Sequence, residues 1–188
     1  PRLLALATLV QLEQQLRTAD TDLRLLFILA NETARLVRYR QSAVWSNRTG
    51  RIETLSGLAD IDYRASYVVW LTRLLKHLSA ERTILTPISA QDLPASIGAD
   101  WDEWFPKHAV WVPLGLATDR VVGGLFLVRD DPWGEGDLRL LAAIGEAAGH
   151  ALLARKAVHR PHRRHSRWIR STLAAGTLAA ALTASIMI

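Results

Sequence analysis

Apolar residues near the start of the chain recur at the spacing of an α-helix. Residues 3–17 carry leucines on one predicted side and glutamines elsewhere. The apolar residues of that side are Leu3, Leu6, Leu9 (or Val10), Leu12 and Leu16. Asp20 or Asp22 can cap the start of a second helix. We expect its buried face to consist of Leu23, Leu26, Ala30, Ala34 and Val37, with Phe27 beside Leu26.

The hydrophobic period changes after residue 40. The stretch QSAVWSNRTGRIETLSG has two short apolar runs on either side of residues 47–50, which predicts a β-hairpin. Gly50 can supply the positive φ that such a turn needs. A third helix is predicted to open at Asp62. Its apolar face contains Tyr67, Leu71, Leu74 and Leu78, with Trp70 beside them.

The second half of the body predicts a loop, two strands and a helix. Pro87, Pro94 and Pro106 interrupt residues 81–108, which we therefore expect to be irregular. Two alternating runs around residues 117–120 predict paired strands. A last helix is expected to begin near Asp137, with an inward face of Leu138, Leu141, Ile144, Ala148 and Leu152. This order of elements predicts an α+β fold, an antiparallel sheet with helices packed on it.

The stretch WVPLGLATDRVVGGLFLVRDDPWGEGDLRLLAAIGEAAGHALLA resembles the C-terminal half of a GAF domain. It contains a strand with Val-Pro-Leu (residues 112–114), a short turn, a strand with Gly-x-Leu (Gly123 or Gly124, and Leu125), an acidic loop, then Asp-Leu and a helix with paired leucines and small residues. The order of elements extends the resemblance over about residues 20–155. It implies a central antiparallel sheet flanked by helices, helices that bundle at a homodimer interface, and a ligand pocket under the third helix and the long loop.

The resemblance directs attention to aromatic residues as candidate pocket residues. Tryptophans are more often core residues, but several here fall on the elements that line the family's pocket. The candidate ligand-binding residues are Trp70, Trp101, Trp104, Phe105 and Trp111. The chain lacks the cysteine to which bilin-attaching members bind their chromophore and the Asn-Lys-x-x-Phe-x-x-x-Asp-Glu signature of cyclic-nucleotide binders. A noncovalent, apolar or aromatic ligand is what remains, and no cofactor is evident.

No catalytic motif stands out in the sequence. The chain has no cysteine, no Gly-rich phosphate loop before a helix, no His-Glu-x-x-His and no Gly-x-Ser-x-Gly. Thiol chemistry, disulfides and Cys-ligated metal centres are therefore excluded, and we expect neither an enzyme nor a metal site.

Positive charge is concentrated near the end of the chain. The 188 residues carry 23 basic and 18 acidic side chains, a net charge of +5. Residues 1–154 alone have a net charge of −2, because seven basic residues and no acid lie between residues 155 and 170. The body therefore lacks the basic face of a nucleic-acid-binding domain, and no nucleic-acid partner is expected.

The basic segment is followed by an uncharged run, from Thr172 to Ile188. As a helix these 17 residues span about 26 Å, somewhat less than the ~30 Å hydrocarbon core. We expect a transmembrane helix that begins at residue 171 and is truncated here; an Ala-rich buried helix is the alternative. The basic residues that would hold the preceding segment on the cytoplasmic side are Arg160, Arg163, Arg164, Arg167 and Arg170.

These patterns predict three regions: a GAF-like domain over residues 1–157, a basic juxtamembrane linker over 158–170, and the start of a transmembrane helix over 171–188. Pro1 is not an initiator methionine, so we expect residues before it. The expected location is a bacterial inner membrane, with residues 1–167 in the cytoplasm.

The order of regions suggests what the domain regulates. Because the predicted span follows the domain, the chain beyond it would leave the cytoplasm, as in HlyD-like membrane fusion proteins of bacterial export systems, whose components would be partners. The first hypothesis is a non-catalytic regulatory domain of such an adaptor. An input domain of a membrane signalling enzyme, such as a kinase or cyclase, and a pure dimerisation scaffold are the alternatives.

Overall fold

Five antiparallel strands form a central sheet in the order β2-β1-β5-β4-β3. The structure, a computed structural model, describes residues 2–115 and 121–158. The strands are β1 (Gln41–Ser46), β2 (Arg51–Leu55), β3 (Thr86–Ile88), β4 (His108–Gly115) and β5 (Val121–Arg129). The predicted α+β fold and both hairpin strand pairs are confirmed, and Gly50 has the expected positive φ of 64°.

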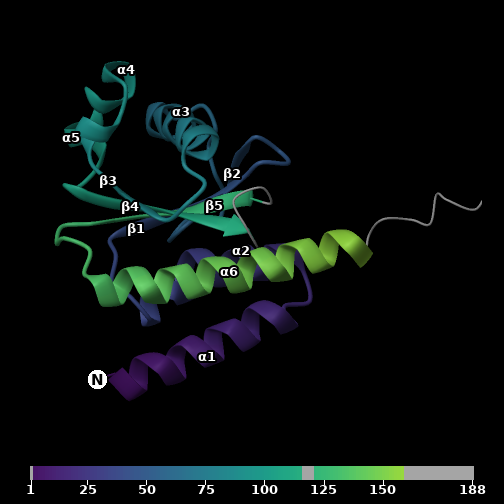
Figure 1. The fold of residues 1–188 in the computed structure, drawn as a ribbon. Helices are drawn as coiled ribbons and strands as arrows, with labels where there is room; N and C mark the ends of the chain where they lie inside the picture. Colours follow the sequence, from purple (N-terminus) through teal and green to yellow (C-terminus); the bar gives the residue numbers. More distant parts are fainter. Residues whose placement is uncertain (1, 116–120, 159–188) are drawn as a thin grey trace, which may run out of the picture. The chain divides into compact units, whose positions relative to one another are not determined.

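Helices cover both faces of the sheet (Figure 1). α3 (Ser66–Glu81) and the short helices α4 (Ala95–Gly98) and α5 (Trp101–Trp104) lie over one face. α2 (Asp22–Asn31) and α6 (Glu135–Val158) lie over the other, and α1 (Arg2–Thr18) packs outside them. Two 3-10 turns, η1 (Glu32–Arg35) and η2 (Ala90–Asp92), complete the described elements.

Side-chain alternation in the central strands divides the core into two clusters. Val110 and Val112 of β4 pack with α1, α2 and α6, whereas Ala109 and Trp111 pack with α3 and α5. β5 alternates in the same way, because successive side chains of a strand point to opposite faces. The α6 side is almost entirely aliphatic and the α3 side is rich in aromatic rings, so the two faces of one sheet differ in chemistry.

The predicted apolar side of the first helix is wrong in its first half. Leu12 and Leu16 are buried, but Leu3 and Leu6 are exposed. Steps of three residues drift by 60° each around a helix, so Leu3 and Leu12 lie on opposite sides of α1.

The predicted face of the second helix is wrong in part: Ala30 and Val37 are buried and Leu26 packs against the core, as predicted, but the start of the face is not. Leu23 and Phe27 are exposed, whereas Leu25, Ile28 and Leu29 are buried. Residues 23–29 contain six large apolar side chains, so periodicity alone does not select the face. The helix also ends earlier than predicted, at Asn31. The side-chain amide of Asn31 donates to the carbonyl of Phe27, and its oxygen accepts the backbone N–H of Gly57. As a result Ala34 lies beyond it, in η1.

Two further boundaries differ from the prediction. α3 begins at Ser66, because Asp62 instead organises a turn by accepting the backbone N–H of Arg64. Residues 81–108 contain β3, α4 and α5 in addition to loop. β3 is short, and its Pro87 lies at the edge of the sheet, where a missing N–H costs no ladder hydrogen bond.

The chain divides into two units, residues 1–154 and 155–188, and the preceding description concerns the first. The predicted basic residues and transmembrane start lie outside the described residues. Within residues 2–115 and 121–158, no helix is both long and apolar enough to cross a membrane.

α6 lies directly on the backbone of β4, because it has glycines at the contact. A Cβ on Gly149 would lie 2.4 Å from the backbone nitrogen of Gly115, and one on Gly145 would lie 2.9 Å from the carbonyl oxygen of Pro113. Real Cβ atoms do not approach other atoms so closely, so these two positions need glycine for packing.

Arg129 connects the end of β5 to the start of α6. Its largely buried guanidinium donates to the carboxylate of Asp137 at 2.7 Å and to the carbonyl of Asp131 at 3.0 Å. The same group lies 3.9 Å from the ring centroid of Trp133. The Arg129 guanidinium therefore combines several hydrogen bonds, an ion pair and a stacking contact with an aromatic ring. A lysine at this position could not make all three.

We predict opposite effects for two Gly-to-Ala substitutions in α6. Gly149→Ala is expected to lower the free energy of unfolding by about 1–3 kcal/mol, because overpacking outweighs the better helix propensity of alanine. Gly136→Ala, the matched control, has open space around the added methyl and is expected to raise it by up to about 1 kcal/mol. Urea unfolding measures both, and a stabilised Gly149→Ala protein would contradict the close contact.

Candidate functional site

Six aromatic side chains pack together between α3, α5 and the sheet. This aromatic cluster consists of Tyr67, Trp70, Trp101, Trp104, Phe105 and Phe126. Phe105 is its centre, with ring centroids 5.1 Å from Trp70, 5.5 Å from Trp101 and 5.4 Å from Phe126. Tilted and edge-to-face pairs at these distances each contribute about 0.5–1.5 kcal/mol beyond burial.

Three buried indoles donate hydrogen bonds to backbone carbonyls, each at 3.0 Å. Trp70 donates to Ile97, Trp101 to Pro106 and Trp111 to Arg82. The accepting carbonyls all belong to the segment between α3 and β4. Because an unpaired buried N–H is costly, these bonds fix that segment against α3 and the sheet.

Trp111 completes the site from the sheet side. A Cβ added to Gly124 of the neighbouring strand would lie 2.1 Å from the indole ring of Trp111. The absence of a side chain at Gly124 therefore gives the indole its space. Close packing against Trp111 accounts for glycine at this position in β5.

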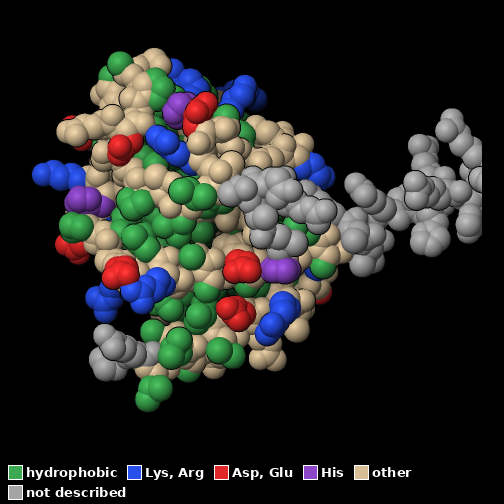
Figure 2. Space-filling view, in the orientation of Figure 1, with side chains coloured by type: hydrophobic (Ala, Val, Ile, Leu, Met, Phe, Trp, Pro, Cys, Tyr) green, Lys and Arg blue, Asp and Glu red, His purple; other side chains and the backbone are tan. Residues whose placement is uncertain are grey.

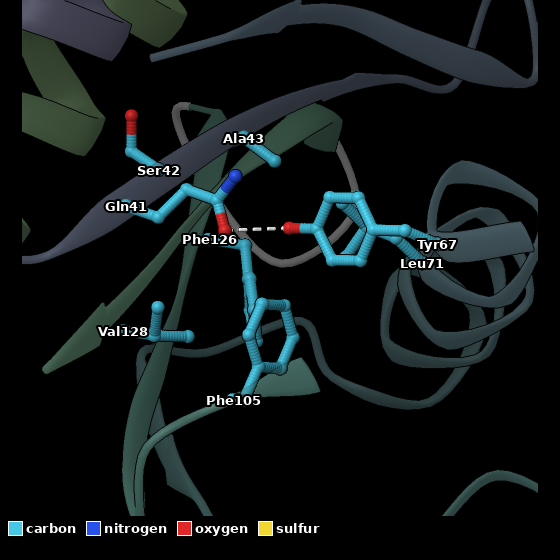
Figure 3. A pocket seen from close by; sticks show the side chains of 8 residues that line it. All are labelled: Gln41, Ser42, Ala43, Tyr67, Leu71, Phe105, Phe126 and Val128. Atoms are coloured by element: carbon cyan, nitrogen blue, oxygen red, sulfur yellow. Dashed lines mark hydrogen bonds between the residues drawn. The ribbon is translucent and has the colours of Figure 1, made fainter. Parts of the chain in front are cut away.

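A narrow cavity, partly open to solvent, remains at one side of the cluster. About 130 Å³ of empty space lies between its walls, but this volume includes open solvent, and the cavity has no room for a water-sized sphere. Gln41 and Ala43 of β1, Tyr67 and Leu71 of α3, and Phe105 are among its lining residues. Figure 3 shows the phenol of Tyr67 and the amide of Gln41 pointing toward one another, and the hydroxyl donates to Oε1 of Gln41 at 2.6 Å. The lining contains no charged side chain.

The environment of Tyr67 keeps its hydroxyl protonated. Burial raises the pKa of Tyr67 well above its ordinary value of 10, and the hydrogen bond with Gln41 offsets only part of that effect. At neutral pH the phenol is therefore a donor, which leaves the Gln41 amide oxygen as its acceptor.

The structure brings the predicted ligand-binding residues to one face of the sheet. Trp70, Trp101, Phe105 and Trp111 are buried and fill the space, whereas Trp104 is half-buried against Tyr67. Of these five residues only Phe105 lines the cavity, so the expectation of an open aromatic pocket is not met, and a role in ligand binding stays a prediction.

Sequence reasoning missed every cavity residue except Phe105, among them Gln41, Tyr67 and Phe126. Gln41 is the first residue of β1, and Tyr67, in α3, is 26 residues further along the chain. The two side chains meet only because α3 packs on the sheet. Phe126 gave a usable signal, because it alternates with Leu125 and Leu127 in a strand that is buried on both faces. Within the part of the chain that the structure describes, no three metal-ligating side chains of the His, Asp or Glu type lie together.

Comparison with known proteins identifies the fold. No family model matches the sequence, and no curated protein matches it. Solved structures do match. The GAF domain of an Acinetobacter phosphoenolpyruvate-protein phosphotransferase is 13% identical, covers 84% of this chain and 98% of its own, and has a TM-score of 0.58.

Two further structures have similar scores. The phycocyanobilin-bound GAF domain of a cyanobacterial phytochrome is 11% identical over 84% of this chain and 98% of its own, with a TM-score of 0.61. Residues 122 to 287 of a methyl-accepting chemotaxis protein are 11% identical over 80% of this chain and 100% of that one, with a TM-score of 0.60. The chain therefore has a GAF domain fold.

The protonated Tyr67 predicts a dependence of stability on alkaline pH. In the unfolded chain this phenol ionises near pH 10, whereas in the fold its pKa is higher, so its contribution is complete below pH 10 and is lost as the pH rises above that value. Tyr67→Phe removes the contribution. We expect the wild type to lose more stability than this variant between pH 9.5 and about 11.5, measured by urea unfolding; parallel losses would contradict the burial of the phenol.

Proposed function

We propose that this chain contains a non-catalytic sensory or regulatory domain, whose candidate input site is the cavity between Tyr67, Gln41 and Phe105. The GAF fold supports a regulatory role, because the similar structures include domains from a phytochrome and a chemotaxis protein. The observation that carries the proposal is that the remaining space within the aromatic face has a polar edge at Tyr67 and Gln41.

The cavity restricts the chemistry of a ligand. Its walls are apolar apart from Gln41 and the Tyr67 hydroxyl, because the Ser42 hydroxyl donates to the carbonyl of Ala30 on the other face of the sheet. A carboxylate or phosphate would therefore lose hydration without gaining a counter-ion. In the described conformation the cavity has no room for a water-sized sphere, so a ligand can enter only if a lining side chain such as Phe105 moves aside, and only a small ligand fits such a limited opening. We therefore propose a small, neutral, single-ring ligand that exchanges hydrogen bonds with Tyr67 or Gln41.

The size of the cavity also distinguishes this domain from a GAF domain that binds a large chromophore. The cyanobacterial phytochrome domain holds phycocyanobilin, a ligand far larger than this cavity. In this domain the aromatic cluster fills the space between α3, α5 and the sheet, and the three indole hydrogen bonds hold it there.

Phenol tests this proposal, with benzoate as the charged control. Phenol is expected to raise the melting temperature in a concentration-dependent way, because a ligand that binds only the folded state stabilises it by about 2.7 kcal/mol at 100 times its Kd. Benzoate is expected to have no such effect.

A variant that fills the cavity serves as a second control. Ala43→Val should abolish the response to phenol, whereas Ala142→Val on the exposed face of α6 should keep it. If phenol fails to stabilise the wild type at millimolar concentrations, or stabilises Ala43→Val equally, the cavity is not the input site.

For the context of the domain, we propose attachment to a bacterial inner membrane through the uncharged run after Thr172, with the basic segment before it on the cytoplasmic side. The support is the one-sided charge of the sequence. Protease added outside intact cells should leave an N-terminal reporter uncut, and cleavage of the reporter would overturn this arrangement.

Two roles fit a domain attached in this way. An adaptor of an export system, similar to HlyD-like membrane fusion proteins, is favoured by the order of domain, basic segment and apolar run in the sequence. An input domain of a signalling protein is favoured by the resemblance to a chemotaxis protein structure. The sequence after the apolar run distinguishes them, because a β-rich, lipoyl-like region indicates the adaptor and a second apolar span indicates the signalling protein.

A further inference from the structure

Gln41 places a side-chain amide at the polar edge of the candidate cavity. It is the first residue of β1 and pairs with Val128 of β5. Alternation along β1 puts Ala43 and Trp45 in the aromatic core, so Gln41, two residues before Ala43, lies on the same face. Among the described lining residues, its amide and the Tyr67 hydroxyl are the polar side-chain groups directed to the cavity.

The hydrogen bond from Tyr67 fixes which end of this amide faces the phenol. The Tyr67 hydroxyl donates to Oε1 of Gln41 at 2.6 Å, and Figure 3 shows the amide oxygen, not the nitrogen, facing the phenol. A turned amide would direct an N–H at the phenol and take away the acceptor of its proton. The other lining side chains are apolar or, in Ser42, directed to the opposite face of the sheet, so they supply no substitute acceptor.

The amide nitrogen of Gln41 is left as a donor. It makes no hydrogen bond to any part of the chain that the structure describes, and it is not fully buried. A primary amide nitrogen has two N–H groups and donates both. A ligand that reaches the polar edge therefore meets a donor at Gln41, and the group that pairs with it must be an acceptor.

The surroundings favour a neutral acceptor. The cavity lining contains no charged side chain, so an anionic acceptor would lose hydration without gaining a counter-ion. Figure 2 shows acidic and basic side chains interspersed on the face that it displays, so that face does not concentrate one sign of charge to attract a charged ligand. Carbonyl and hydroxyl oxygens are acceptors that carry no net charge.

We propose that Gln41 determines the specificity of the candidate site, and that the ligand is a small ring with a carbonyl or hydroxyl oxygen that accepts a hydrogen bond from the Gln41 amide nitrogen. This inference rests on the proposed function, since it concerns the same cavity, and it adds the chemical group by which a ligand is selected. A ligand without an acceptor would cover this donor, which would lose water and gain no partner. Tyr67 is a positioning residue, because it holds the amide in the orientation that presents the nitrogen.

Two ring compounds of nearly the same shape test the proposal. Cyclohexanone has a carbonyl oxygen, and methylenecyclohexane has a methylene group in its place. Their Kd values are measured from the concentration dependence of the melting temperature of the full 188-residue chain. The variants are Gln41→Met, which keeps the length of the side chain and removes the donor, and Tyr67→Phe, which removes only the hydroxyl. Gln14→Met on the exposed side of α1 is the matched control.

Gln41→Met is expected to weaken cyclohexanone binding at least about fivefold, the effect of one hydrogen bond, and to change the Kd of methylenecyclohexane less than about twofold. Gln14→Met should change neither. In Tyr67→Phe the amide keeps its donor but loses its orientation, so cyclohexanone should bind less tightly than to the wild type and more tightly than to Gln41→Met. A cooperative melting transition without ligand shows that each variant is folded.

Equal weakening of both compounds in Gln41→Met would indicate a changed cavity shape, and unchanged cyclohexanone binding would show that Gln41 does not select the ligand. Either result overturns this inference, while the response to phenol still decides separately whether the cavity is the input site. Tyr67→Phe that binds cyclohexanone as tightly as the wild type would overturn the positioning role of Tyr67. If neither phenol nor cyclohexanone raises the wild-type melting temperature, the input site is wrong and this inference falls with it.

Discussion

Hydrogen bonds from three buried indoles to backbone carbonyls hold one face of this domain closed. Between α3 and β4 the chain has only short elements, which cannot fix their own position through secondary structure. Trp70, Trp101 and Trp111 supply that fixation by bonding to carbonyls spread from Arg82 to Pro106. The aromatic cluster can then pack around Phe105, and the cavity beside Tyr67 is the space that this packing leaves.

The opposite face of the sheet is constructed differently. Aliphatic side chains from β4 and β5 meet α2 and α6, and glycines let α6 approach the backbone of β4. No polar anchor of the indole type is needed there, because a long helix keeps its own hydrogen bonds. The two faces of one sheet are therefore held by different interactions, helix-to-backbone packing on one side and indole hydrogen bonds on the other.

Much of the fold is present in the sequence as alternation and turn chemistry. The two hairpins follow from apolar runs around residues 47–50 and 117–120, and α6 follows from a clear helical period. The sequence does not show which side of α1 or α2 faces the core. A helix rich in leucine has several apolar sides, and only packing selects the one that is buried. For this reason the sequence pattern places Leu3 and Leu6 on the buried side of α1, whereas the structure exposes them.

The candidate site was predictable only in part. Tryptophans on α3, the loop and β4 pointed to the correct face of the sheet, but composition does not tell a ring that lines a cavity from one that fills it. That difference depends on partners far away in the sequence, such as the carbonyl of Ile97 for Trp70 and the space above Gly124 for Trp111. Gln41 likewise becomes a site residue only when β1 and α3 are placed together.

The closed aromatic face is tested most directly by hydrogen exchange at the indole nitrogens, followed by NMR. The account predicts that the indole protons of Trp70, Trp101 and Trp111 exchange slowly, at rates set by opening of the whole domain, because each is buried and hydrogen-bonded. The half-buried Trp104 provides the internal reference for faster exchange. If any of the three indoles exchanges as fast as Trp104, the segment between α3 and β4 is not held in the way described.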